Sequence, residues 1–159
     1  MPKIFMRREP DIPFTQKGFD ELKKERKKLL AERPQAVNNL REAREMGDLS
    51  ENGYYKEARA KLSSIDGRVG RLDRLIRLAV VVKSRNTGRV EIDSKVFLKT
   101  GEKKVEFAIV GGYESDPNKG TISYRSPLGQ ALMGKKAGDM VKVEAPAGQR
   151  EYSILKISG

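Results

Sequence analysis

The chain contains no cysteine and no histidine among its 159 residues. Without cysteine it has no disulfide framework, thiolate nucleophile or cysteine-based zinc site, and without histidine it lacks the usual proton shuttle at neutral pH. No stretch approaches the roughly 18 to 20 consecutive apolar residues of a membrane span, and residues 1–13 lack an apolar signal segment. We therefore expect a cytoplasmic protein with no membrane partner, whose chemistry rests on carboxylates, amines, hydroxyls or a metal held by oxygen.

Charge is abundant, because 35% of the residues are charged and the formal net charge is +11, from 33 Lys and Arg against 22 Asp and Glu. A basic excess of this size favours an anionic partner such as nucleic acid. Hydrophobic residues make up 37%, which is enough for a core. The length suits one compact domain with an extended element, or two small domains.

We expect residues 1–14 to form an N-terminal leader and residues 15–83 to form an antiparallel α-helical coiled-coil hairpin. Thr15 fits the N-cap of the first helix, with Phe14 and Phe19 as a hydrophobic staple, so this helix should run from Gln16 to about Met46. A short connection over residues 47–50 makes the two helices antiparallel. The apolar seams consist of Leu22, Leu29, Ala36, Leu40 and Ala43 in the first helix and of Tyr55, Ala58, Leu62, Ile65, Val69, Leu72, Ile76 and Ala79 in the second.

Three residues of the first helix depart from this pattern. Arg26 and Arg33 occupy positions where an apolar residue would pack better in a coiled coil. Pro34 lies inside the helix and should bend it or remove a hydrogen bond.

Residues 84–88 read as a linker, because turn-forming residues cluster there and the helical periodicity stops. Residues 89–159 contain short β-rich runs separated by Gly, Pro, Asn and Asp, which predict a small α+β domain. The expected strands are Val90–Leu98, Val105–Val110, Thr121–Tyr124, Met140–Glu144 and Glu151–Ile157, with a short helix over Pro127–Met133.

Two carboxylates, Asp48 and Glu51, lie in the connection between the helices. If Asp48 caps the second helix, Glu51 occupies the third helical position and both carboxylates lie on one side of the tip. Two such groups can bind Mg²⁺ weakly, and a tight site would need further ligands from a partner. The same spacing also fits an ordinary capping box, and spacing alone does not choose between the two.

Residues 47–52, Gly-Asp-Leu-Ser-Glu-Asn, resemble the signature of the Gre family of transcript cleavage factors. The surrounding Arg33-Pro34, Glu42-Ala43-Arg44 and Tyr55 match as well. A second block follows in residues 126–132, Ser-Pro-Leu-Gly-Gln-Ala-Leu, then in Gly134-Lys135, Gly138-Asp139 and Pro146-Ala147-Gly148. Leu49 is more similar to the GreA branch than to the GreB branch.

This resemblance implies a monomeric elongation factor that inserts its hairpin tip into the secondary channel of bacterial RNA polymerase. The factor would stimulate the polymerase's own cleavage of backtracked RNA and would not itself be an enzyme. Asp48 and Glu51 would act in catalysis by holding Mg²⁺ jointly with the polymerase. The C-terminal domain would be FKBP-like, and its residues Ser126, Pro127 and Leu128 would dock on the rim coiled coil of the largest subunit.

The resemblance also gives a set of tip residues that would contact the RNA 3′ end or the polymerase: Ser50, Asn52, Tyr55, Arg41, Arg44 and Arg59. Structural alternatives stay open for several of them. Tyr55 begins the apolar seam of the second helix, and Ser50 and Asn52 can satisfy turn amides. In the same way Ser126 and Pro127 can simply start a helix as N-cap and first residue.

Three other functions remain as alternatives. The protein could block the polymerase channel without stimulating cleavage, although the intact Asp48 and Glu51 pair argues against this. The C-terminal domain could act as a prolyl isomerase or chaperone, but it has no tryptophan and few aromatic residues for such a pocket. The hairpin could also be a basic coiled coil that binds nucleic acid without the polymerase.

Overall fold

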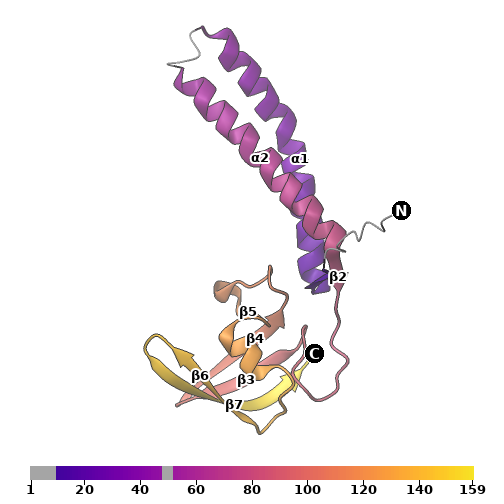
Figure 1. The fold of residues 1–159 in the computed structure, drawn as a ribbon, viewed down its shortest axis with the longest axis vertical. Helices are drawn as coiled ribbons and strands as arrows, with labels where there is room; N and C mark the ends of the chain where they lie inside the picture. The colour runs from indigo at the N-terminus through magenta and orange to yellow at the C-terminus, as the bar shows by residue number, and fades with distance from the viewer. Residues whose placement is uncertain (1–9, 48–51) are drawn as a thin grey trace, which may run out of the picture. The chain divides into compact units, whose positions relative to one another are not determined.

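The computed structural model describes residues 10–47 and 52–159 of the chain. These residues divide into two compact units (Figure 1). One unit is Asp20–Leu78, and the other combines residues 10–19 with Ala79–Gly159. The fold is α+β, as predicted, with a helical hairpin followed by a β-sheet domain. No helix within the described residues is long and apolar enough to cross a membrane.

Two long helices, α1 (Gln16–Glu45) and α2 (Gly53–Leu78), form the hairpin (Figure 1). Their ends lie close to the predicted ones, and Pro34 sits inside α1. The predicted apolar seam supplies most of the buried side chains, of which Ile65 and Leu72 are 2% and 0% exposed. Leu75 of α2 is also buried, although the predicted seam did not include it. The pairing of Arg26 with Asp73 and of Arg33 with Asp66 shows that the two helices run antiparallel. Seven residues forward on α1 correspond to seven residues back on α2.

A short parallel pair of strands, β1 (Ile12–Phe14) and β2 (Ala79–Val81), was not predicted. The sequence assigned residues 12–14 to a leader and Ala79 to the second helix, whereas both segments are extended and hydrogen-bonded to each other. Strands of three residues are too short to show an alternating pattern. Phe14, only 1% exposed, lies in this pair and stacks on Tyr113 with ring centroids 6.3 Å apart.

The start of α1 is held by a carboxylate from far along the chain. Thr15 caps the helix as predicted, since its hydroxyl accepts a hydrogen bond from the Gly18 N–H at 3.1 Å. The Glu114 carboxylate accepts hydrogen bonds from the Thr15 N–H at 2.9 Å and the Gly111 N–H at 2.8 Å. It also accepts a bond from the Thr15 hydroxyl. We call this cluster of Thr15, Gly18, Gly111 and Glu114 the Glu114 clasp.

The C-terminal domain is built on a five-stranded sheet with strand order β5-β4-β3-β7-β6. Within this sheet, β4 and β5 pair in parallel and the other neighbouring strands pair antiparallel. The strands are β3 (Lys95–Thr100), β4 (Lys103–Val110), β5 (Thr121–Ser123), β6 (Met140–Ala145) and β7 (Gly148–Ser158). A 3₁₀ turn, η1 (Pro117–Lys119), precedes β5.

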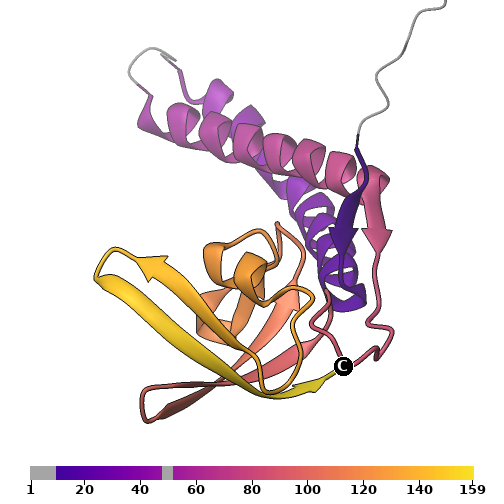
Figure 2. The same ribbon diagram turned by 60° about the horizontal axis from the view of Figure 1, so that its bottom comes forward.

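One face of this sheet and helix α3 (Pro127–Leu132) enclose the hydrophobic core of the domain (Figure 2). Val96, Leu98 and Ile109 point into it, and Leu132 of α3 is completely buried against them. The predicted first strand, Val90–Leu98, is too long at its start. Residues before Lys95 form a turn, in which Asp93 adopts a left-handed conformation with φ 77° that a strand cannot contain.

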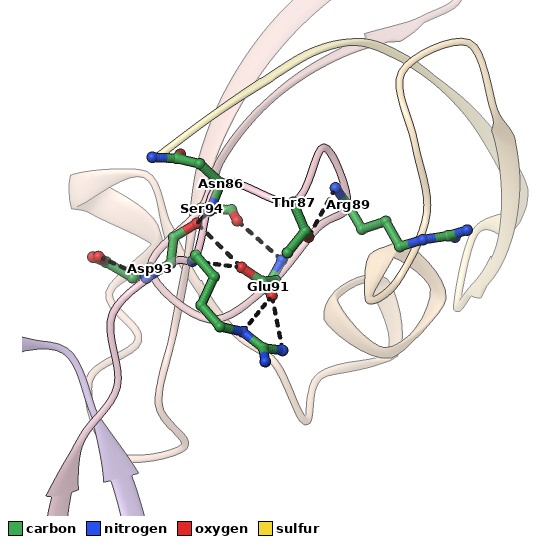
Figure 3. A network of polar contacts seen from close by, with 8 residues as sticks. Asn86, Thr87, Arg89, Glu91, Asp93 and Ser94 are labelled. Atoms are coloured by element: carbon green, nitrogen blue, oxygen red, sulfur yellow. Dashed lines mark hydrogen bonds and ion pairs between the residues drawn. The ribbon is translucent and has the colours of Figure 1, made fainter.

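The predicted linker, residues 84–88, is hydrogen-bonded to the C-terminal domain (Figure 3). The Glu91 carboxylate accepts bonds from the Arg85 N–H at 2.8 Å and the Ser84 hydroxyl at 3.3 Å, and it pairs with the Arg85 guanidinium at 3.3 Å. These bonds lower the pKa of Glu91, with the backbone bond from Arg85 contributing most. The segment is therefore tied to the domain that follows it.

Candidate functional site: the hairpin tip and the docking segment

The connection between α1 and α2 carries the residues predicted to act at the tip. Asp48, Ser50 and Glu51 lie outside the described residues, so their roles as metal ligands and RNA contacts stay predictions. The residues on either side are described. They show how the two helices end and which side chains accompany the connection.

Asn52 holds the two helices together where α2 begins. Its side-chain oxygen accepts a hydrogen bond from the Tyr55 N–H at 3.1 Å, which makes Asn52 the N-cap of α2. Its side-chain nitrogen donates to the Ala43 carbonyl of α1 at 2.8 Å. The expectation that Asp48 could cap the second helix is therefore wrong, because α2 begins at Gly53 and its cap is Asn52.

Arg44 and Tyr55 contact each other across the hairpin. The guanidinium carbon of Arg44 lies 5.9 Å from the centre of the Tyr55 ring, within the range of a cation–π interaction. Tyr55 is half-buried and Arg44 is exposed. Both residues were predicted to contact RNA or polymerase, and in the free protein each has a structural partner in the other helix.

The two remaining predicted arginines differ in their surroundings. Arg41 donates a hydrogen bond to the Asn38 side chain at 2.7 Å, one turn earlier on α1. Arg59 is exposed on α2 and has no recorded partner among the described residues. Arg59 is thus the more available cation for an incoming phosphate.

Two exposed apolar side chains near the tip were missed by the sequence reasoning. Met46 is 67% exposed and Tyr54 is 72% exposed. They line a shallow hollow of about 390 Å³ together with Glu42, Glu57 and Lys61. The sequence could have indicated this exposure. Both residues are large and lie beside the tip motif, yet neither belongs to the apolar seam that the helices bury.

Three arginine–carboxylate pairs join α1 and α2 below the tip. Arg26 bonds to Asp73 at 2.5 Å, Arg33 to Asp66 at 2.6 Å, and Arg68 to Glu25 at 2.7 and 2.9 Å. The view of Arg26 and Arg33 as poorly packing seam residues is therefore incomplete, because each reaches a carboxylate on the other helix. Pairs this exposed contribute little energy each, but they fix which residues face one another.

These pairs shift the ionisation of their members. Hydrogen bonds from Arg68 lower the pKa of Glu25, and burial opposes them only in part. The hydrogen bond from Arg33 likewise lowers the pKa of Asp66. Both carboxylates are therefore ionised at neutral pH, and the pairs persist there.

The predicted docking segment lies at the start of α3. Ser126 is its N-cap, since its hydroxyl accepts a bond from the Gly129 N–H at 3.1 Å and donates to the Ser123 carbonyl at 2.7 Å. Pro127 is the first helical residue and is exposed, whereas Leu128 is half-buried against the core. Helix initiation thus explains Ser126 and Pro127 structurally and leaves the Pro127 ring open to a partner.

A tight metal site is not found in the described part of the chain, where no three or more Asp or Glu residues come together in a suitable group. The chemistry of Asp48 and Glu51, two carboxylates separated by two residues, fits partial ligation of a hard cation. The remaining ligands would have to come from another molecule.

Two family models match the chain over nearly its whole length. The model described as "Transcription elongation factor, N-terminal" matches residues 12–81, and "Transcription elongation factor, GreA/GreB, C-term" matches residues 85–159. Transcription elongation factor GreA of Ruegeria pomeroyi is 42% identical over 92% of this chain and 96% of that protein. GreA of Lactococcus lactis is 38% identical over 94% of this chain and 99% of that protein.

Among solved structures, GreA factor homolog 1 of Thermus thermophilus is 23% identical, with 94% of this chain and 99% of that chain covered and a TM-score of 0.44. The sequence relatives and the two matched models together cover both the hairpin and the sheet domain. The chain therefore belongs to the GreA/GreB family of transcription elongation factors.

Proposed function

We propose that this protein stimulates the cleavage of backtracked RNA by bacterial RNA polymerase, with the hairpin tip entering the secondary channel. The observation that carries the proposal is the placement of Asp48 and Glu51 in the connection between two long helices that Asn52 joins directly. A helix of 30 residues spans about 45 Å, so a carboxylate at its end can reach far into another molecule. Family membership supports polymerase as that molecule.

In this proposal the protein is not itself an enzyme. Asp48 and Glu51 are the residues that would hold a Mg²⁺ ion jointly with polymerase carboxylates, and the free protein would bind the ion weakly. When bound, Mg²⁺ would activate water and stabilise charge on the oxygens of the scissile phosphate. The protein's own contribution would be to bring the two carboxylates to the reacting phosphate and to hold the transcript there.

The residues that flank the tip connection are suited to holding the transcript. Arg59 is exposed and has no recorded partner in the described chain, so its guanidinium can bind a phosphate directly. Arg44 would exchange or share its contact with Tyr55 when RNA arrives. Contacts of this kind add affinity that depends on salt and not on sequence.

The C-terminal domain would dock on the coiled coil of the polymerase's largest subunit through the Ser126 to Leu128 segment. The exposed ring of Pro127 is the natural contact, because the Ser126 hydroxyl already makes two hydrogen bonds and Leu128 packs toward the core. Docking there would anchor the factor while the tip acts elsewhere.

The test uses polymerase halted in a backtracked complex with end-labelled RNA. The variant D48N/E51Q should bind polymerase with the affinity of the wild type and lose stimulated cleavage. The matched control is E21Q/E45Q, which removes two negative charges from exposed positions of α1 and should retain cleavage. Cleavage that survived in D48N/E51Q would refute the metal role, and binding without stimulation by the wild type would favour a channel-blocking regulator.

A further inference from the structure

The sheet of the C-terminal domain has two chemically different faces. Along β3, Val96 and Leu98 point into the core, so Lys95, Phe97 and Lys99 point to the opposite face. Phe97 is half-buried, and both lysines are exposed. Helix α3 packs on the core side, so this opposite face is left without α3.

Strand pairing places further lysines around Phe97. Lys104 of β4 lies opposite Lys99, and Lys156 of β7 lies opposite Phe97. The Lys156 ammonium is 5.8 Å from the centre of the Phe97 ring. An aromatic ring on an exposed sheet face thus has lysines near it on three adjacent strands, while Glu106 of β4 lies directly opposite the ring.

The same face continues into a hollow of about 560 Å³ at the start of β3 and the end of β4. Lys95 and Glu106 line the hollow and also belong to the area around Phe97. Lys17 from the first turn of α1 and Lys119 from η1 line it from other elements. We call the combined surface the lysine face; its basic members are Lys17, Lys95, Lys99, Lys104, Lys119 and Lys156.

The lysine face carries a clear excess of positive charge. Its six lysines stand against two acidic residues, Asp93 and Glu106. Within residues 10–47 and 52–159, none of the six makes a recorded ion pair or side-chain hydrogen bond. By contrast, Lys142 of the neighbouring strand β6 forms an ion pair with Glu151 of β7 at 3.4 Å. Unpaired like charges repel, so an anionic ligand would relieve the repulsion.

We propose that the lysine face binds single-stranded RNA, with phosphates against the lysines and a base stacked on Phe97. Lysines that track a backbone beside an aromatic platform are the usual means of holding a single strand. A duplex keeps its base faces stacked internally and could not use Phe97, and an acidic peptide would use the charges alone. This inference goes beyond the proposed function, which assigns RNA contact to the hairpin tip.

The test measures binding of a short fluorescein-labelled single-stranded RNA to the full-length protein by anisotropy, between about 50 and 200 mM salt. The variant K99Q/K104Q removes two lysines of the face. If each contacts a phosphate, the slope of log K against log salt should fall by about 1.4, since a single strand gives about 0.7 per contact. The matched control is K135Q/K136Q, which removes the same charge from exposed positions directly after α3 and should leave the slope near that of the wild type.

A substitution at Phe97 tests base stacking separately from the charge of the lysines. F97L keeps an apolar side chain and should weaken binding of single-stranded RNA about fivefold, while binding of a duplex of equal length stays unchanged. Far-ultraviolet circular dichroism checks that each variant is folded. An equal loss in K99Q/K104Q and K135Q/K136Q, or no loss in either, would overturn the proposal.

Two further outcomes are decisive. Competition by poly-glutamate as strong as that by RNA would overturn the proposal in favour of an acidic protein partner. D48N/E51Q leaves the lysine face intact and should bind the RNA like the wild type. Loss of stimulated cleavage in that variant and loss of RNA binding in K99Q/K104Q therefore report on separate properties.

Discussion

The Glu114 clasp predicts that one carboxylate stabilises the start of α1 from about 100 residues away. Replacing Glu114 by alanine removes the acceptor of three hydrogen bonds, two of them from the N–H groups of Thr15 and Gly111. Gly111 is buried, so its N–H cannot simply turn to water. Hydrogen bonds to a charged group contribute about 1.5 to 3 kcal/mol, and partial hydration would recover some of this, so we expect a loss of about 3 kcal/mol.

Two variants separate the hydrogen bonds from other effects. Both N–H groups bond to the same carboxylate oxygen, Oε2, and a glutamine can present its carbonyl oxygen there. E114Q should therefore lose about 1 kcal/mol, less than half the effect of E114A. The control E102A removes an exposed glutamate with no recorded partner in the described chain and should change nothing.

Gly18 provides an independent check with an opposite sign. A glycine-to-alanine change inside a helix normally stabilises by about 1 kcal/mol. At Gly18, however, an added Cβ would collide with the Glu114 carboxylate, so G18A should destabilise by displacing Glu114. The matched control is G70A in α2, where an added Cβ meets no atom within 4 Å and the normal stabilisation is expected.

The assay is amide hydrogen exchange, which reads each N–H separately and does not require the two units to unfold together. The opening free energy of the Thr15 and Gly111 amides should fall in E114A and in G18A and stay near the wild-type value in E102A. If the protection of both amides changed by less than about 0.5 kcal/mol in E114A, the reasoning from the clasp would be refuted.

Two further predictions concern the hairpin. Because hydrogen bonds from Arg68 lower the pKa of Glu25 in the folded state, this pair contributes stability above the unfolded pKa of about 4.3 and loses it as the pH falls through the lower folded pKa. E25Q should thus lower the melting temperature slightly at pH 7 and have less effect near pH 3, and an equal effect at both values would contradict the pairing. N52A should expose the Tyr55 amide to hydrogen exchange and cost about 1 kcal/mol of local stability. N52D should keep the cap and lose only the hydrogen bond to the Ala43 carbonyl. Normal protection of the Tyr55 amide in N52A would argue against the cap.

The long helices were predictable because their apolar residues repeat over many turns. The seam from Tyr55 onward located the body of α2, but its start was placed too early, because Asn52 and not Asp48 caps the helix. The staple at Phe14 located the start of α1. The strands of the C-terminal domain were recognisable from β-rich runs between turn residues. Errors arose where elements were short: the three-residue strands β1 and β2 give too few residues for any period, and Val90–Ser94 is β-rich but forms a turn around Asp93.

The candidate site likewise has features that the sequence predicted and features that it did not. The tip motif and the docking segment were recognisable from sequence, because each is a continuous run of residues. The partners of their flanking side chains were not, since Asn52 with Ala43, and Arg44 with Tyr55, depend on which residues of two helices face one another. The arginines in the seam looked unfavourable for the same reason, until Asp66 and Asp73 were seen opposite them.

The sequence by itself determined the local features of this protein: two helices with apolar seams, a cap at Thr15, short strands, and two acidic residues in one connection. These depend on neighbours three to seven residues apart. Only the tertiary structure decided which distant groups meet, such as Glu114 with Thr15, or the lysines that three strands bring around Phe97. The physical reason is that hydrogen bonds and charges act over a few ångströms in space, whereas the residues that make these contacts are separated by tens of positions along the chain.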